Sequence, residues 1–256
     1  RIYYRRHHSC EWRHGDDMTP TQTAFPDIDL IIFDCDGTLV DSEYLNHIAT
    51  AQLLGEIGLD YNIRDIVAQF KGMKLSKVIP HLEARHGVRF PGDYSSEYVR
   101  LVEENAPKHL KVVEGVSAFV SSAAEKYKIC VGSNGEITNI TSSLQRCDLR
   151  KFFPDSAIFN AAMVSQPKPA PDLFLFAADK MGVSPDRCLV IEDTALGTEA
   201  AVSAGMNIWG FTGTADDPEK SEQEMQQAGA QGIIKHFRDI QNEIDGDFLQ
   251  RSQQSA

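Results

Sequence analysis

Four segments of the chain share one pattern, in which a continuous apolar run ends abruptly in polar residues. They are DLIIFDCDG (29–37), YKICVGSNG (127–135), RCLVIEDTALG (187–197) and NIWGFTG (207–213). Such a run without alternation is typical of a strand buried on both faces of a parallel sheet. Helical patterns lie between the strands, for example at 115–127 and 171–182. The alternation predicts a doubly wound, mainly parallel, Rossmann-like α/β sheet, whose ligands bind beyond the carboxyl ends of the strands.

The chain between the first two of these strands has a different character. Residues 42–111 carry apolar positions at helical spacing, and no segment among them has a convincing strand pattern. We therefore predict an all-α cap domain inserted into a core made of residues 27–41 and 112–240. The two joints, near 41–42 and 107–112, would let the cap open and close over a site.

Length and composition agree with one soluble core that carries an insert. The chain has 256 residues, of which 42% are hydrophobic and 24% charged, as in ordinary globular proteins. Its formal net charge of -12 disfavours nucleic acid and anionic membranes as partners, but a local group of cations can still bind a small anion. No apolar run approaches the roughly 20 residues of a membrane-spanning helix.

The two ends of the chain differ from the rest. Residues 1–26 begin with an Arg- and His-rich stretch that lacks the apolar centre of a signal peptide. We interpret them as a disordered leader, vector-derived or otherwise non-native, with a metal-binding histidine tract as the alternative. We assign no function to the polar tail 241–256. The five cysteines, odd in number and mostly in apolar surroundings, are typical of reduced thiols in a cytoplasmic protein.

Two aspartates end the first strand, with Cys35 between them. Alternate side chains of an extended chain share a face, so Asp34 and Asp36 can point together while Cys35 points into the core. The pair alone also fits a simple Asp-Gly hairpin turn. A calcium loop of the EF-hand type does not fit, because Thr38 and Leu39 occupy positions that require Asp or Asn and Gly.

Acidic residues also end the third strand, at Glu192 and Asp193. Two acidic strand ends that are neighbours in one sheet repel each other unless a cation lies between them. Asp34, Asp36 and Asp193 together would form a hard oxygen site of the kind that suits Mg²⁺.

Two further groups near the strand ends suggest phosphate binding. Ser133 offers a hydroxyl beside backbone N–H donors, although such a serine is more often part of a turn. Lys168 stands between Pro167 and Pro169, which predict an extended, rigid backbone, and Pro171 begins a helix. A lysine on such a loop is usually plain surface, but beside carboxylates it can neutralise charge on a nucleophile and on a phosphoryl group.

The combined motifs resemble those of the haloacid dehalogenase superfamily, in their order and with a helical cap after the first. They are DCDGTLVDSE (34–43), GSN (132–134), KPAPD (168–172) and VIEDTALGTEAAVSAGM (190–206). The resemblance implies that Asp34 is the nucleophile, which receives the phosphoryl group as an aspartyl phosphate. It implies that Asp36 is the general acid and then the general base. A second aspartate in the first motif favours phosphoryl transfer over dehalogenation or phosphonate cleavage.

The same resemblance assigns the remaining site residues. Thr38 and Ser133 would hydrogen-bond the phosphoryl oxygens, Asn134 would position the group, and Lys168 would bridge nucleophile and phosphate. The metal ligands implied for Mg²⁺ are Asp34, the backbone carbonyl of Asp36, and Asp193, with Glu192 in or near the coordination shell.

The cap decides whether water or a sugar hydroxyl accepts the phosphoryl group. In the β-phosphoglucomutase branch, which the cap resembles, a histidine follows the second aspartate by ten residues; here Asn46 stands at that position and His47 is adjacent. That branch also uses a lysine and an arginine in a cap loop, where this chain has Lys71 and Leu75. Both departures weaken the mutase interpretation.

The loop FKGMKLSKVI (70–79) is instead similar to that of sugar-phosphate phosphatases, the 6-phosphogluconate phosphatases among them. This likeness assigns Lys71, Gly72 and Lys74 to substrate binding, with a solvated helix face as the alternative. We expect a Mg²⁺-dependent phosphatase acting on a small phosphorylated metabolite, such as a sugar phosphate. A phosphohexomutase and a non-enzymatic binding or regulatory module are the alternatives. No nucleic acid or membrane partner is expected. The oligomeric state is open, and a monomer is compatible with the sequence.

Overall fold

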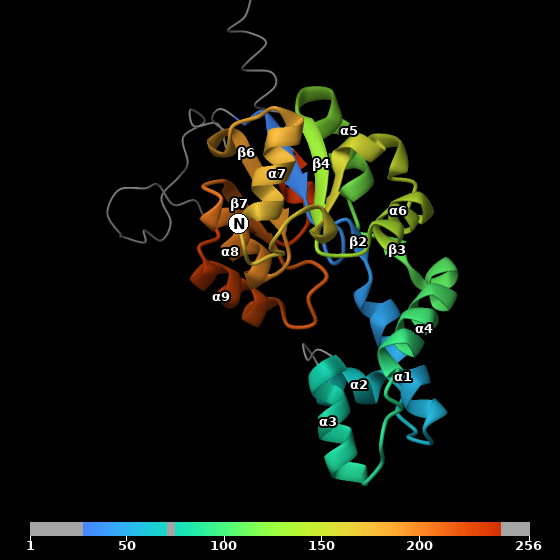
Figure 1. Ribbon diagram of the computed structural model, residues 1–256. Helices are drawn as coiled ribbons and strands as arrows, with labels where there is room; N and C mark the ends of the chain where they lie inside the picture. The colour runs from blue at the N-terminus through green and yellow to red at the C-terminus, as the bar shows by residue number, and fades with distance from the viewer. Residues whose placement is uncertain (1–27, 71–74, 242–256) are drawn as a thin grey trace, which may run out of the picture.

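The computed structural model describes residues 28–70 and 75–241. Within them, six parallel strands form one sheet in the order β5-β4-β1-β6-β7-β8 (Figure 1). In that order the strands are Ile158–Asn160, Lys128–Ser133, Leu30–Phe33, Cys188–Glu192, Asn207–Phe211 and Gly232–Ile234. This confirms the predicted doubly wound sheet. β1 lies at its centre, between β4 and β6, so the polar ends of the predicted strands meet at one edge.

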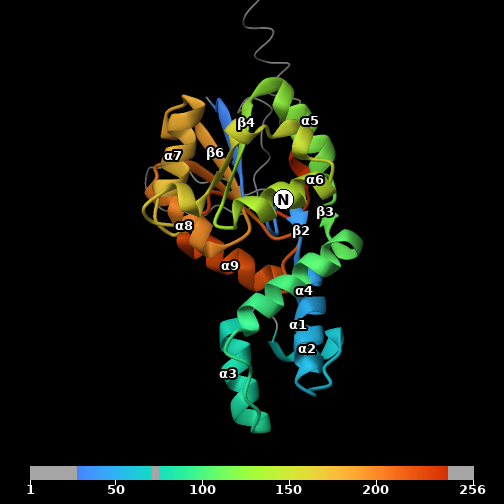
Figure 2. The same ribbon diagram turned by 45° about the vertical axis from the view of Figure 1, so that its right-hand side comes forward.

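Helices cover both faces of the sheet (Figures 1 and 2). Their bounds are α5 Val116–Lys126, α6 Ile137–Arg146, α7 Asp172–Met181, α8 Ala195–Ser203 and α9 Pro218–Ala228. Short 3-10 turns lie at Arg150–Phe152, Asp155–Ala157, Ala161–Met163 and Pro185–Arg187. Leu30 and Ile32 of β1 pack under α7 and α8, whereas Ile31 and Phe33 pack under α5 and α6. The unbroken apolar run of β1 is therefore explained, because both of its faces are buried.

The cap helices are α1 Glu43–Glu56, α2 Ile63–Phe70, α3 Leu75–His86 and α4 Tyr94–His109. They project from one end of the sheet domain (Figure 2) and have an apolar core of their own, which includes Leu54, Phe70 and Leu82. The sequence analysis assigned this part of the chain to an inserted helical cap. None of the helices in the described ranges has the length and apolarity to cross a bilayer.

Two short strands connect the cap helices to the sheet domain. β2 (Val40–Asp41) and β3 (Lys111–Val112) pair antiparallel, with Val40 opposite Val112. The two joints were predicted in this region, but the strands were not, because two-residue strands leave no pattern in the sequence. Their pairing holds both crossings of the chain side by side, close to the end of β1.

Candidate active site

The site lies where β4, β1 and β6 end. The amide of Asp34 donates to the carbonyl of Ile191 at 2.9 Å, which extends the pairing of β1 and β6 by one residue. This contact places Asp34 beside Glu192, the last residue of β6, while Ser133 ends the neighbouring β4. Residues separated by about 160 positions therefore meet through parallel strand pairing alone.

Lys168 lies at the centre of this edge. Its Nζ is 2.6 Å from Asp34 Oδ1 and 2.9 Å from Glu192 Oε1, and all three residues are buried. The ammonium also lies 4.7 Å from the centre of the Phe174 ring. Burial lowers the pKa of Lys168, but Asp34 and Glu192 together outweigh burial and raise that pKa above its ordinary value. The lysine is thus a fixed cation in contact with the predicted nucleophile.

Asn134 fixes the backbone of Lys168. The Lys168 amide donates to Asn134 Oδ1 at 3.1 Å, and Asn134 Nδ2 donates to the Lys168 carbonyl at 3.2 Å. The expected extended backbone is wrong at this point, because the Ala170 amide bonds the Pro167 carbonyl at 3.0 Å and closes a turn. The predicted rigidity of Lys168 therefore rests on this turn and on Asn134, a role that the sequence did not indicate.

Three carboxylates crowd around the lysine. Asp34, Glu192 and Asp193 each offer an oxygen within 4.8 Å of the others. Burial, the largest cause, raises the pKa of Asp34 to about 7 and that of Asp193 well above its ordinary value, and the Glu192 charge adds to both shifts. One ammonium does not neutralise three carboxylates, so the group favours a second cation.

The described residues fit a hard metal ion at this place. Asp193 Oδ1 is buried and has no hydrogen-bond partner among the described residues, so it is available as a ligand. Glu192 differs, because Oε1 accepts from Lys168 and Oε2 accepts from both the amide and the hydroxyl of Thr194 at 2.7 Å. Asp34 and Asp193 are therefore better suited to direct ligation than Glu192, whose predicted metal role stays a prediction.

Two glycines permit the close packing of this site. A Cβ on Gly37, whose φ is +84°, would lie 2.1 Å from Asp193 Oδ2. A Cβ on Gly197 would lie 1.8 Å from Glu192 Oε1. Thr214, after β7, donates its hydroxyl to the Gly37 carbonyl at 2.6 Å and ties a third loop to the site. These three residues were not predicted from the sequence. A signal for the two glycines was present, because each motif quoted above that ends a strand contains a glycine.

The other predicted groups of the first two motifs lie around the same edge. Asp36 and Ser133 both face Gly135, where an added Cβ would lie 3.7 Å from Asp36 Oδ2 and 3.4 Å from Ser133 Oγ. The Asp36 residue is exposed, yet the protein atoms around its carboxyl exclude water and raise its pKa. A hydrogen bond from Ser42 opposes this shift. Thr38 is buried, and its hydroxyl has no hydrogen-bond partner among the described residues.

Cys35 is fully buried in the apolar core, as predicted for a residue that points away from the site. Burial raises the pKa of its thiol well above the ordinary value, and the adjacent Asp36 and Asp34 charges add to this effect. A protonated, inaccessible thiol is a poor nucleophile.

The predicted substrate contacts in the cap are Lys71, Gly72 and Lys74, which lie outside the described residues. Asn46 accepts a hydrogen bond from the Tyr98 hydroxyl at 3.1 Å. His47 turns toward a different set of partners, Glu43 and Asp216.

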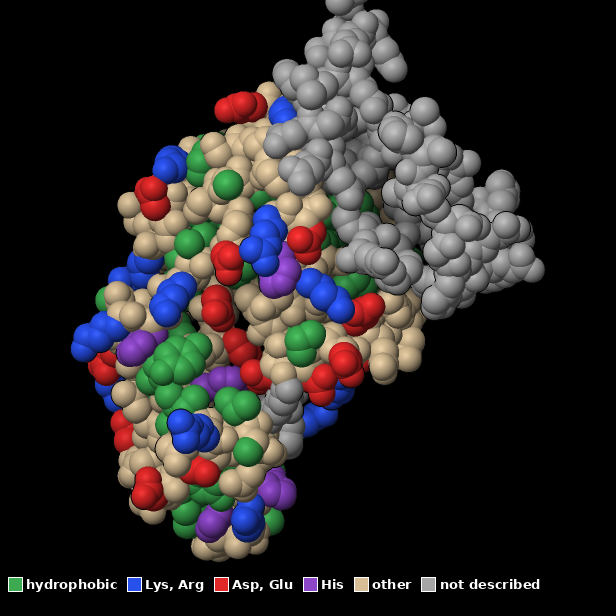
Figure 3. Space-filling view, turned by 180° about the vertical axis from the view of Figure 1, so that it is seen from behind, with side chains coloured by type: hydrophobic (Ala, Val, Ile, Leu, Met, Phe, Trp, Pro, Cys, Tyr) green, Lys and Arg blue, Asp and Glu red, His purple; other side chains and the backbone are tan. Residues whose placement is uncertain are grey.

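A cavity of about 390 Å³ lies inside the cap and reaches the sheet domain at Thr194, next to Asp193. Polar groups on its wall include Asn46, Thr50 and Tyr98, and apolar ones include Phe70. Figure 3 shows acidic side chains gathered around a hollow between the sheet domain and the cap.

Residues 31–211 match the family of haloacid dehalogenase-like hydrolases. The chain is 31% identical to a 6-phosphogluconate phosphatase of Escherichia coli K12 over 72% of its own length and 82% of the relative's. It is also 31% identical to a fructose-1-phosphate phosphatase of the same strain, over 70% of this chain and 93% of that protein.

A solved structure has the same fold. A family hydrolase from Deinococcus radiodurans, described with bound phosphate and sodium, has a TM-score of 0.70 and 27% identity to this chain. The match covers 84% of this chain and 93% of that one. It therefore includes both the sheet domain and the cap helices.

Proposed function

The chain belongs to the haloacid dehalogenase-like hydrolase family, and on that premise we propose that it is a Mg²⁺-dependent phosphatase of small phosphorylated carbohydrates. The observation that carries the proposal is the buried contact between Lys168 and Asp34, because it holds a carboxylate and a cation together at the end of β1. Relatives named for 6-phosphogluconate and fructose 1-phosphate support the substrate class.

Asp34 is the nucleophile in this proposal. Lys168 binds Oδ1, which leaves Oδ2 to attack phosphorus as the bond to the leaving oxygen breaks. Asp36, exposed beside Gly135, donates a proton to that oxygen. Asp36 then accepts a proton from water, whose oxygen attacks phosphorus and releases inorganic phosphate and free Asp34. Lys168 offsets the negative charge of Asp34 and of the phosphoryl group throughout.

The metal ligands in the proposal are Asp34, Asp193 and the backbone carbonyl of Asp36. The buried, unpartnered Asp193 Oδ1 supports this choice, as does the excess of carboxylates over cations. When bound, Mg²⁺ would supply positive charge to the phosphoryl oxygens. Thr38, Ser133 and the loop amides would complete the set of donors to the phosphoryl oxygens.

Hydrolysis is favoured over transfer to a sugar. Asn46, held by Tyr98, occupies the position of the histidine that the mutase branch uses, and Leu75 occupies that of the arginine. A purely binding role is disfavoured because Asp34, Asp36, Lys168 and Asp193 are all present. If β-glucose 1-phosphate gave mainly glucose 6-phosphate and little free phosphate, the mutase would replace the phosphatase.

Phosphate release from sugar phosphates tests the proposal directly. The wild type should release phosphate with Mg²⁺, and EDTA should stop the reaction until Mg²⁺ is restored. Asp34→Asn should lose at least about 10³-fold in rate, because the attacking oxygen is replaced. Asp179→Asn, on the exposed face of α7, is the matched control and should keep full activity. Equal rates in Asp34→Asn and Asp179→Asn would exclude the mechanism.

A further inference from the structure

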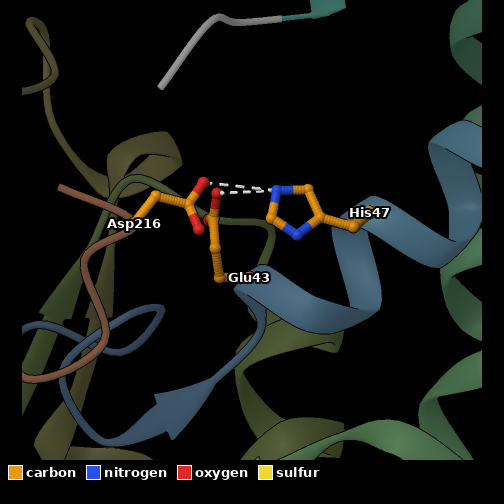
Figure 4. Close-up of side chains that lie close together, drawn as sticks. All are labelled: Glu43, His47 and Asp216. Carbon is orange, nitrogen blue, oxygen red and sulfur yellow. Dashed lines mark ion pairs between the residues drawn. The ribbon is translucent and has the colours of Figure 1, made fainter. Parts of the chain in front are cut away.

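A charged cluster joins the cap to the sheet domain away from Lys168. His47 Nε2, on α1, lies 3.4 Å from Asp216 Oδ2 in the loop between β7 and α9 and 3.5 Å from Glu43 Oε1 (Figure 4). Only 12% of the His47 side chain and 18% of that of Asp216 are exposed. The contact is partly shielded from water, and it links two segments that are far apart in sequence.

The two carboxylates of the cluster repel each other. Burial raises the pKa of Glu43, Asp216 raises it further, and His47 has the opposite effect. Other charged or titratable groups nearby are Asp41 of β2, Tyr98 of α4 and Lys220 of α9. Asp216 Oδ2 is buried without a hydrogen bond among the described residues. The His47 imidazole, at 3.4 Å, is therefore placed to offset the charge of this oxygen. Without His47, the cap and the core would meet through two facing acids.

The position of α1 matters for the site. The same helix carries Asn46, His47 and Thr50 on the wall of the cap cavity, and that cavity reaches the core at Thr194, beside Asp193. A shift of α1 relative to the loop 212–217 would therefore move the cavity wall relative to Thr194 and Asp193. Displacement of bound groups by about 1 Å is enough to affect a reaction strongly.

We propose that His47 is a positioning residue that ties α1 to the loop 212–217 through Asp216 and so sets where the cap cavity meets the sheet domain at Thr194, beside Asp193. This inference rests on the proposed phosphatase activity for its kinetic consequences. His47 touches neither the reacting phosphoryl group nor Asp34 in this role. It acts on the leaving-group end of the substrate, through the placement of Asn46 and its neighbours.

The kinetic test compares His47→Gln, Asp216→Asn, their double variant and His47→Lys. His47→Gln should raise KM for a sugar phosphate about tenfold with a smaller change in kcat, as expected for the loss of one partly buried ion pair. p-Nitrophenyl phosphate, whose leaving group lacks the sugar hydroxyls, should be hydrolysed as by wild type. The double variant should be no worse than the worse single one, because both changes remove the same contact. His47→Lys supplies a cation to Asp216 and should recover most of the loss.

His236→Gln is the matched control, because His236 is an exposed histidine of the sheet domain, and its KM should equal that of wild type. Additive effects of His47→Gln and Asp216→Asn would overturn the proposal. So would an equal loss for sugar and aryl phosphates, or a loss in His236→Gln as large as in His47→Gln.

Hydrogen–deuterium exchange gives a readout that needs no catalysis. Amides of both 43–50 and 212–217 should exchange faster in His47→Gln and in Asp216→Asn than in wild type, with α7 unchanged as the internal reference. Unchanged exchange in both segments would overturn the proposal even in an active enzyme. If instead exchange responds as expected but no phosphate is released by the wild type, the contact stands and the proposed function fails.

Discussion

Lys168 shows how one buried side chain can organise a group of carboxylates. It is buried, and its ammonium is paired with two carboxylates and faces an aromatic ring. A buried charge of this kind is tolerated only when its partners are in place. Removal of the lysine would leave Asp34 and Glu192 buried and adjacent with no cation between them.

Lys168→Met should therefore affect activity and stability together. We expect phosphate release to fall by about 10²–10³-fold, because no cation remains to offset charge at Asp34. The free energy of unfolding should fall by about 3 kcal/mol, the cost of breaking a buried pair. Lys180→Met, at an exposed position on α7, is the control and should change neither quantity. A stable and fully active Lys168→Met would contradict the assigned role, as measured by phosphate release and by denaturant unfolding.

The crowded carboxyls also predict how stability depends on pH. Burial raises the pKa of Asp34 from 3.8 to about 7, and Asp193 is shifted in the same direction. A carboxyl with a raised pKa in the folded state binds its proton more tightly there, so stability falls as pH rises from about 4 to about 7.

Calorimetry at pH 6 and pH 8, with EDTA or with Mg²⁺, measures this dependence. The metal-free protein should melt at a higher temperature at pH 6 than at pH 8. Each kcal/mol by which the free energy of unfolding differs should change the melting temperature by about 2–4 °C. Mg²⁺ should raise the melting temperature more at pH 8, because it competes with protons for the same carboxylates. A metal-free protein that melts higher at pH 8 would contradict the interpretation.

At the scale of elements, the site depends on loops that are packed against one another without room for extra atoms. Gly37 is the clearest case, because its φ of +84° and its approach to Asp193 both exclude a side chain. Gly205 has a similar φ of +72°, but a Cβ there would meet no atom within 4 Å. Substitution of Gly205 therefore tests backbone strain alone, whereas substitution of Gly37 adds a contact with Asp193.

Gly37→Ala should lose phosphate release by about 10²-fold or more, because the new methyl group displaces the Asp193 carboxylate. Gly205→Ala should only lower the melting temperature by a few degrees, the effect of strain at a positive φ. Activity with increasing Mg²⁺ and thermal unfolding of both variants provide the measurement. Equal activity of the two variants would show that the approach of Gly37 to Asp193 has no function.

The elements of the central sheet were predictable because each long strand is apolar on both faces. β5 and β8 have three residues each and were not predicted, and neither were the two-residue strands β2 and β3. Segments this short contain too few residues for an apolar run or an alternation to stand out in the sequence, and their pairing depends on longer neighbours. The turn at Lys168 was missed for a related reason, since Asn134, which stabilises it, is 34 residues away in sequence.

At the scale of the whole molecule, the carboxylate–lysine cluster and the cap cavity are built from different parts. Asp34 and Asp193 follow β1 and β6 and Lys168 comes from the loop before α7, whereas the cavity is lined mainly by the cap helices. The sequence could predict the first group, because the motifs carry polar residues at strand ends. It could not predict the cavity, because Asn46, Phe70 and Tyr98 come together only when three cap helices pack.

Tyr98→Phe tests the role of the cap in selectivity. The change removes the hydroxyl that holds Asn46 and should raise KM for sugar phosphates about fivefold, the worth of one hydrogen bond. Hydrolysis of p-nitrophenyl phosphate should not change, and Tyr94→Phe on the same helix is the control. An equal effect on both substrates would place selectivity elsewhere.

The central claim is that Asp34 carries the phosphoryl group between two chemical steps. Asp36→Ala treated with p-nitrophenyl phosphate and Mg²⁺ provides the most direct measurement, because this leaving group needs no proton while the later attack of water is slowed. After rapid acid quenching, peptide mapping by mass spectrometry should find the phosphoryl group on Asp34, and Asp34→Asn/Asp36→Ala should carry none. A phosphoryl group on another residue, or on both proteins equally, would contradict the account.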